Sequence, residues 1–278
     1  MLGDSFTFIE RSRRIVRFRT PLFFQVERII AVWFMIWFWI GLVVVAMNWR
    51  TPFGPWADFI FMALASSLIL LHLARSYPSG RIFWAFLWTV VVSGAVEIIG
   101  TLTGFPFGPY AYTENFGPRL FGILPLAIPL AWLVVVWPVF LACRSVLVPA
   151  GKFLTIPVLT AFIAVWVDFI LEPVATEPVR QYWLWESGGS YYGVPWINFV
   201  GWWFTAWLIA FGLQWLVPNG PLLRGRDLRV PLSVFGAVVI TFLLSALTHL
   251  LWGPILLGIP LLALLVAFAW LNRHPGTL

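Results

Sequence analysis

Apolar residues in this chain gather into long runs that are separated by short polar segments. Each run approaches the roughly 20 residues that a helix needs to cross a bilayer, where a helix satisfies its own backbone hydrogen bonds. The pattern predicts eight membrane-spanning helices, at residues 29–47, 57–74, 82–103, 122–143, 153–171, 195–217, 231–249 and 252–271. Only His249 and the pair Gly253-Pro254 interrupt the final stretch, so seven spans are the alternative.

Composition also indicates a membrane protein. The chain is 61% hydrophobic and 10% charged, and a soluble domain of 278 residues could not bury that much apolar surface. We find no internal repeat and no linker long enough to separate two domains. We therefore expect an all-α polytopic helix bundle, with one transmembrane domain over residues 1–278 of an integral, multi-pass membrane protein.

The formal net charge of +6 reflects membrane topology and does not call for a nucleic-acid partner. Most of the 17 Lys and Arg residues fall on the side of the basic N-terminal segment 1–28 when eight spans are assumed. Because basic loops stay in the cytoplasm, both termini are predicted to be cytoplasmic. The stretch 10–19 is either a topology signal alone or a short amphipathic helix on anionic headgroups. A bacterial cytoplasmic membrane is the expected location.

Five polar residues are predicted to share the non-cytoplasmic half of the bilayer: Glu97, Asp168, Glu172, Asn198 and His249. An ionisable group inside a span is costly and asks for a partner or a function. The helical neighbours of Glu97 are small, which allows either close packing of another helix or space for a ligand. Glu97 is therefore either hydrogen-bonded in a tight helix contact or part of a ligand site. Asp168 and Glu172 lie four residues apart on one helix face and would repel if both were ionised. We therefore expect one of them to be protonated or paired; the alternative is that both cap the helix end in headgroup water.

Two long outer loops, at 104–120 and 172–195, are rich in aromatic residues, glycine and proline. Such loops can fold as ordered lids over a cavity, whereas an aromatic belt at the membrane interface is the simpler alternative. The sixth span then places Asn198, Gly201 and Trp202 on one face. Polar and flat aromatic groups are therefore expected to meet in the same region.

Cofactor chemistry finds little support in the sequence. A lone His249 near carboxylates is not a specific metal spacing, and Cys143 is the single cysteine. We find no phosphate-binding loop, nucleophile elbow or dinucleotide fingerprint. The sequence predicts neither a metal site nor a cofactor.

These motifs together resemble a known family. They are Glu97-Ile98-Ile99-Gly100; Phe105-Pro106-Phe107-Gly108 with Tyr110 and Tyr112; Asp168 with an acid-Pro pair four residues on; Trp183 and Trp185; and Tyr191-Tyr192-Gly193-Val194-Pro195 with Asn198, Gly201 and Trp202. The set resembles the carotenoid biosynthesis membrane proteins that include the CruF-type carotenoid 1',2'-hydratases and the haloarchaeal bisanhydrobacterioruberin hydratases. The resemblance covers roughly residues 90–205. One departure is Glu172-Pro173, where the family pattern leads us to expect Asp-Pro.

The resemblance implies addition of water across the terminal double bond of an acyclic carotenoid end, such as that of lycopene, gamma-carotene or a longer carotenoid, without a cofactor. Such a hydration needs an acid, a cation stabiliser and a held water. A buried carboxylic acid favours its neutral form, and Trp or Tyr faces stabilise a cation. We expect Glu97, Asp168 and Glu172 to be catalytic, with either Asp168 or Glu97 as the acid. The expected substrate-binding residues are Tyr110, Tyr112, Tyr191, Tyr192, Asn198, Trp202 and Gly100, and Gly94, Gly100 and Gly201 are expected to open a groove for the polyene.

Two other classes of function stay open at this point. A proton-coupled secondary transporter would use Glu97 and Asp168 as a proton relay and the aromatic loops as gates. A non-catalytic carotenoid-binding subunit would need the groove but not the acids. The sequence leaves the oligomeric state open.

Overall fold

The structure is a computed structural model that describes residues 20–49, 53–148, 152–217 and 225–271. Within these ranges eight helices are long and apolar enough to span a membrane. They are α2 (Pro21–Ala46), α3 (Trp56–Leu73), α4 (Ser79–Thr103), α5 (Ala127–Leu147), α6 (Thr155–Ala175), α7 (Trp196–Leu216), α8 (Gly225–Thr248) and α9 (Trp252–Leu271). The predicted all-α bundle of eight spans is confirmed, and α8 and α9 are separate helices. The cytoplasmic placement of the termini stays a prediction.

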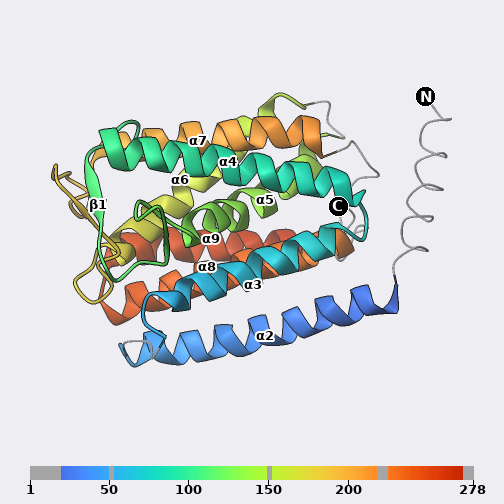
Figure 1. The fold of residues 1–278 in the computed structure, drawn as a ribbon, viewed down its shortest axis with the longest axis horizontal. Helices are drawn as coiled ribbons and strands as arrows, with labels where there is room; N and C mark the ends of the chain where they lie inside the picture. The colour runs from blue at the N-terminus through green and yellow to red at the C-terminus, as the bar shows by residue number, and fades with distance from the viewer. Residues whose placement is uncertain (1–19, 50–52, 149–151, 218–224, 272–278) are drawn as a thin grey trace.

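Helices α3, α4, α6, α7 and α8 pack around α5 (Figure 1). About two-thirds of the apolar window of α5 is buried (67%), against 11% for α2, which lies at the edge of the bundle. α4 and α7 run side by side, and α6 packs against both α5 and α7. This arrangement brings the ends of α4, α6 and α7 to one end of the bundle, beside β1 (Figure 1).

The two outer loops and the start of the predicted fourth span contain short strands that the sequence pattern did not reveal. β1 (Tyr110–Tyr112) pairs antiparallel with β4 (Trp183–Trp185), and β2 (Arg119–Leu120) pairs with β3 (Leu124–Pro125). The second pair explains why α5 begins at Ala127, five residues after the predicted start of its span. The predicted loops are therefore ordered segments, and β1 and β4 tie one to the other.

The boundary of α6 also differs from the prediction. The span was expected to end at residue 171, but α6 continues to Ala175 with Pro173 inside it. Proline is tolerated in a membrane helix when another group satisfies the backbone carbonyl that it leaves free. Glu172 therefore lies within the helix, and the loop begins at residue 176.

At the opposite end of the bundle, an ion-pair cluster joins α2 to α3. Arg75 Nε lies 2.5 Å from Glu27 Oε2, and His72 Nδ1 lies 3.5 Å from Glu27 Oε1. Glu27 is only 4% exposed, so a buried charge on α2 is paired instead of isolated. Most of the predicted basic segment 1–28 precedes this point, and residues 1–19 lie outside the described residues.

Candidate active site

Three carboxyl groups are buried at one end of the bundle. Glu97 lies in the last two turns of α4, and Asp168 and Glu172 lie in the last two turns of α6. Their residues are 5%, 0% and 2% exposed. None of the three forms an ion pair with a basic residue in the described part of the chain. Their cost of burial must therefore be met by hydrogen bonds and by retained protons.

The β1–β4 ribbon supplies four of these hydrogen-bond donors. Tyr110 pairs with Trp185, and Tyr112 pairs with Trp183, in the antiparallel register. Since side chains alternate across a strand, all four rings lie on the same face of the ribbon. The alternate residues Ala111 and Leu184 are exposed. The sequences Tyr-Ala-Tyr and Trp-Leu-Trp thus form a two-stranded lid with a polar aromatic inner face.

Glu97 receives hydrogen bonds at both carboxyl oxygens. The hydroxyls of Tyr110 and Tyr112 donate to Oε2 at 2.8 and 3.0 Å. The indole N–H of Trp132, from the centre of the bundle on α5, donates to Oε1 at 3.3 Å. The Thr101 hydroxyl donates to the Tyr110 oxygen at 3.3 Å and so helps to hold that ring.

Glu172 is held in the same way, and an amide links it to Asp168. The indole N–H groups of Trp183 and Trp185 both donate to Glu172 Oε2 at 3.1 Å. Asn198 Nδ2, at the start of α7, donates to Asp168 Oδ2 at 2.8 Å and to Glu172 Oε1 at 3.2 Å. The second oxygen of Asp168, Oδ1, is buried without a hydrogen-bond partner among the described residues. One carboxyl oxygen of Asp168 is therefore not engaged by the described residues.

Tyr191 donates a hydrogen bond to a backbone carbonyl of α6 next to Asp168 and Glu172. Pro173 has no N–H, so the carbonyl of Phe169, four residues earlier, receives no bond from within the helix. The Tyr191 hydroxyl donates to that carbonyl at 2.8 Å. Burial, followed by the nearby Tyr192 and Asp168, raises the pKa of Tyr191, which keeps the phenol protonated as a donor. The Tyr-Tyr motif thus supplies the hydrogen bond that the acid-Pro pair removes from the helix.

The ring of Phe107 fills the space between two glycines that were expected to line an open groove. A Cβ at Gly100 would lie 2.8 Å from the Phe107 ring, and one at Gly201 would lie 2.6 Å from it and 2.9 Å from the Pro106 carbonyl oxygen. Near Gly94 the closest atom is a methyl group of Leu124, at 3.3 Å. The glycines let the lid loop approach α4 and α7, and the groove beside Gly100 and Gly201 is closed in this structure.

The other expected site residues fall into two groups. The Trp202 ring packs on Trp132 with 4.3 Å between centroids, so it lies one aromatic layer from Glu97. Tyr192 lies elsewhere: it is 44% exposed, and its hydroxyl accepts the Gly253 N–H at 3.0 Å at the start of α9. It satisfies a free N–H of that helix end and makes no hydrogen bond to the carboxyl groups.

His249 does not hydrogen-bond to the three carboxyls either. Its Nε2 lies 3.5 Å from Glu177, and its Nδ1 lies 2.8 Å from the Ser245 carbonyl oxygen. A search of the described residues finds no group of three His, Cys, Asp or Glu side chains placed to hold a metal ion.

The sequence did not identify Trp132 as a site residue and did not predict the position of Phe107. Trp132 is one of many tryptophans, and only the folded contact distinguishes it as a donor to Glu97. Phe107 was noticed as part of a motif, but its place between two helices depends on the lid. Trp183 and Trp185 were noticed as part of the family pattern and are now seen to bind Glu172.

The lid tyrosines remain hydrogen-bond donors over the whole ordinary pH range. Burial, together with the Glu97 charge, raises the pKa of Tyr110 and of Tyr112 above the usual value near 10. Both phenols therefore stay protonated and keep pointing their O–H groups at Glu97.

Comparison with known proteins identifies the family of this chain. The family model described as "Carotenoid biosynthesis protein" matches residues 56–265, which include every carboxyl, tyrosine and tryptophan of the site. The chain belongs to this carotenoid biosynthesis family.

A curated protein is also similar to part of the chain. Over 119 residues the chain is 30% identical to the bisanhydrobacterioruberin hydratase of Haloarcula japonica, a match that covers 42% of this chain and 40% of that protein. No solved structure matches the chain. The family resemblance inferred from the sequence is thus confirmed, and the chain is a multi-pass membrane protein.

Proposed function

We propose that this protein hydrates the terminal carbon–carbon double bond of an acyclic carotenoid end, with Asp168 as the proton donor. The observation that carries the assignment is the hydrogen-bond pattern of the three carboxyl groups. Glu97 and Glu172 each accept three hydrogen bonds, whereas Asp168 accepts one and has a free Oδ1. Donors directed at a carboxyl group favour its ionised form. Of the three carboxyl groups, Asp168 has the fewest donors, so we assign the reactive proton to Asp168.

The reaction follows from this arrangement. The π electrons of the double bond take the proton from Asp168 Oδ1, which forms a C–H bond at the less substituted carbon. A tertiary carbocation remains on the neighbouring carbon, and a water oxygen then forms the C–O bond. The water's excess proton passes to Glu97 and returns to Asp168 before the next turnover. No redox step and no cofactor is required by this balance.

Aromatic faces support the cationic intermediate. The Trp132 ring lies beside Glu97, and the Trp202 ring packs on it at a tilt; a desolvated cation over a Trp face gains ~2 kcal/mol or more. The ionised Glu97 and Glu172 add an attractive field in a region of low dielectric constant. Because the site is buried, the carotenoid end is proposed to displace part of the lid, and the Phe107 loop is the segment that closes the approach between α4 and α7.

The proposed substrates are carotenoids with at least one acyclic end, such as lycopene or gamma-carotene. Supporting this choice are the family membership and the hydratase name of the relative, together with a site that lies in the membrane region of the bundle. The bacterial cytoplasmic membrane is the proposed location.

The test is pigment analysis after expression in a lycopene-accumulating bacterial host. The protein should produce a more polar pigment heavier by one water, and Asp168→Asn should abolish it while the variant still inserts in the membrane. Glu186→Gln is the matched control, since Glu186 is exposed on the ribbon-bearing loop and should leave conversion unchanged. Unchanged lycopene, gamma-carotene and longer acyclic carotenoids with folded wild-type protein would refute the hydratase proposal and favour the proton-coupled transporter.

A further inference from the structure

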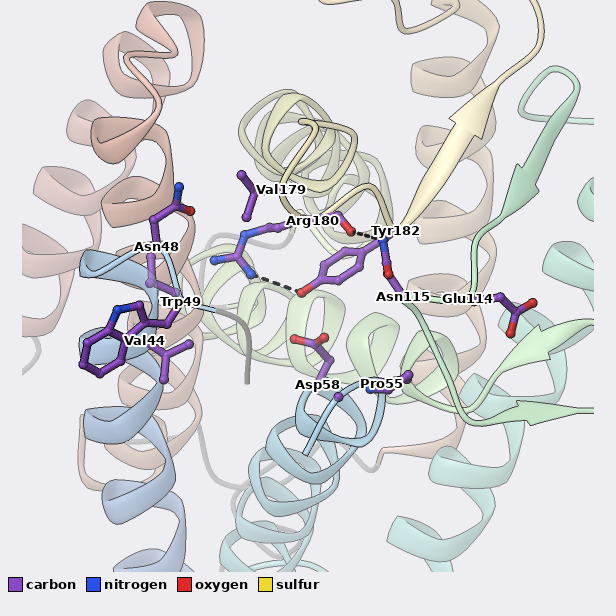
Figure 2. A pocket seen from close by; sticks show the side chains of 12 residues that line it. Val44, Asn48, Trp49, Pro55, Asp58, Glu114, Asn115, Val179, Arg180 and Tyr182 are labelled. Atoms are coloured by element: carbon purple, nitrogen blue, oxygen red, sulfur yellow. Dashed lines mark hydrogen bonds between the residues drawn. The ribbon is translucent and has the colours of Figure 1, made fainter. Parts of the chain in front are cut away.

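A second polar cluster lies at the same end of the bundle, outside the three-carboxyl site. Asp58 stands in the first turn of α3, and Arg180 and Tyr182 come from the segment between α6 and β4 (Figure 2). Arg180 Nη1 donates to the Tyr182 hydroxyl at 3.1 Å, and its Nε donates to Ser245 Oγ at 3.1 Å. Asp58 lies beside Arg180 and Tyr182 in the same cluster (Figure 2). The reaction proposed above uses none of these residues.

Two hollows meet at this cluster. The first has a volume of about 300 Å³ and is bordered by polar groups that include Asn48 and Asn115. The second, of about 110 Å³, is lined mainly by apolar side chains of α2 and α3. Asp58, Arg180 and Tyr182 line both. The polar groups thus stand where a water-facing hollow becomes an apolar crevice.

The apolar crevice continues along α2. Phe38 lines the second hollow and also a third one of about 430 Å³, which lies between α2, α8 and α9. The lining residues on α2 run from Val45 back to Phe34, which at the rise of an α-helix is about 17 Å. A Cβ added at Gly41, within the crevice, would meet no atom within 4 Å. Because α2 is the least buried helix, the crevice lies where lipid-dissolved molecules can reach it.

The cluster carries no excess of positive charge. Burial acts to lower the pKa of Arg180, but Tyr182, Asp58 and Glu177 outweigh it and raise the pKa, so the guanidinium stays charged. Burial, with the Asp58 charge, raises the pKa of Tyr182, so its phenol stays protonated. The Arg180 cation is thus matched by two carboxylates, Asp58 and Glu177, and a further anion would gain little.

The cluster still offers one donor and one acceptor to a ligand. Arg180 Nη2 makes no hydrogen bond to the described part of the chain, and the carboxyl group of Asp58, which lines both hollows, can accept a hydrogen bond from a ligand. A neutral hydroxyl both accepts and donates, and so it fits this pair. A phosphate group would face Asp58 and Glu177 with the wrong charge.

We propose that this crevice is a second binding site, which holds the hydroxylated end of a linear carotenoid between Asp58 and Arg180, with the chain along α2. The identity of the occupant rests on the proposed function, because hydration produces such an end group. The two sites share one segment of chain: Tyr182 stacks on Phe116 at 4.7 Å, and the next residue, Trp183, binds Glu172. The product's polar end would therefore be held beside the reaction site after release.

The experiment measures binding of lycopene and of its 1-hydroxy derivative to purified Asp168→Asn protein in lipid nanodiscs. Quenching of tryptophan fluorescence by the polyene reports the binding. Asp168→Asn removes the proposed proton donor, so the measurement does not depend on turnover. We expect at least tenfold tighter binding of the hydroxylated pigment, and equal binding of the two pigments would overturn the proposal.

Two further variants locate the site. Gly41→Phe places its ring in the crevice, where a Cβ at Gly41 has open space, and should weaken binding of the hydroxylated pigment at least tenfold. Gly80→Phe is its control, since Gly80 also has open space around it but lies at the start of α4. Asp58→Asn should abolish the preference for the hydroxyl group, and size-exclusion profiles verify folding of each variant. Unchanged binding in both Gly41→Phe and Asp58→Asn would overturn the site.

Two comparisons separate the remaining explanations. Nanodiscs with and without an anionic phospholipid should bind the hydroxylated pigment equally. If the anionic lipid displaces it, Arg180 binds a phosphate headgroup and the proposal is wrong. Selective binding in a protein that hydrates no carotenoid would leave the second site standing while the proposed function fails.

Discussion

The close packing of the lid loop against Gly201 predicts the effect of adding a single methyl group there. Gly201→Ala would place a Cβ 2.6 Å from the Phe107 ring and 2.9 Å from the Pro106 carbonyl oxygen. Carbon atoms pack best at about 3.5–4.0 Å, so the lid loop must move by about 1 Å. Overpacking of this kind costs about 1–3 kcal/mol of stability.

The displacement should reduce activity more than stability. Tyr110 follows Phe107 by three residues, and its hydroxyl lies 2.8 Å from Glu97. A misplacement of about 1 Å at a reaction site can lower a rate about 100-fold. We therefore expect Gly201→Ala to retain its fold in detergent, with a lowered melting temperature, and to convert pigment about 100-fold more slowly.

A companion pair of variants tests the cause. Gly100→Ala meets only side-chain atoms of Phe107 and Tyr110, so Phe107→Leu should restore part of its lost activity. The Gly201→Ala defect should persist with Phe107→Leu, because the Pro106 carbonyl still blocks the methyl group. Gly41→Ala, which meets nothing, is the control for melting temperature measured by size-exclusion fluorescence. Wild-type conversion rates in both Gly100→Ala and Gly201→Ala would refute the role of the lid.

Three further predictions follow from the hydrogen bonds. Tyr191→Phe leaves a backbone carbonyl without its donor and should cost about 1–3 kcal/mol, measured as a lowered melting temperature. Trp183→Phe combined with Trp185→Phe removes two bonds to Glu172 and should slow conversion by 10-fold or more, since each such bond contributes about 1.5–3 kcal/mol. Burial raises the pKa of Tyr112 in the folded protein, so its contribution to stability is full below pH ~10 and is lost progressively above it; Tyr112→Phe should flatten this alkaline loss in thermal melts.

Matched changes at exposed positions control these variants. Trp196→Phe removes an exposed indole bond to Ser190 and should leave conversion unchanged. Equal melting of Tyr191→Phe and wild type would show that the carbonyl freed by Pro173 finds another donor. Wild-type conversion in the double tryptophan variant would contradict the role of Glu172, and an unaltered alkaline profile in Tyr112→Phe would place the pH effect elsewhere.

The helices and the buried acids could be predicted because their physics is local. Runs of about 20 apolar residues predict spans, and a carboxyl group inside a span needs a partner, which drew attention to Glu97 and Asp168. Helical spacing also placed Asp168 and Glu172 on one face. The amide of Asn198 that joins them required knowledge of how α6 packs against α7.

The contacts made by the loops were beyond the sequence pattern. Small residues at positions 100 and 201 indicate close approach, but they do not say what approaches, and an aromatic ring fills the space that we expected for substrate. Tyr192 was expected in the pocket, yet it binds the end of α9. Asp58 escaped notice because an acidic residue in the first turn of a helix is favourable on its own.

The most direct test of the central claim uses purified protein, lycopene and isotopically labelled water. In heavy-oxygen water the product hydroxyl should carry the heavy oxygen, and in deuterated water one deuterium should appear on the neighbouring carbon, both absent with Asp168→Asn. A product whose new oxygen does not come from water, or equal conversion by wild type and Asp168→Asn, would contradict hydration by this carboxylic acid.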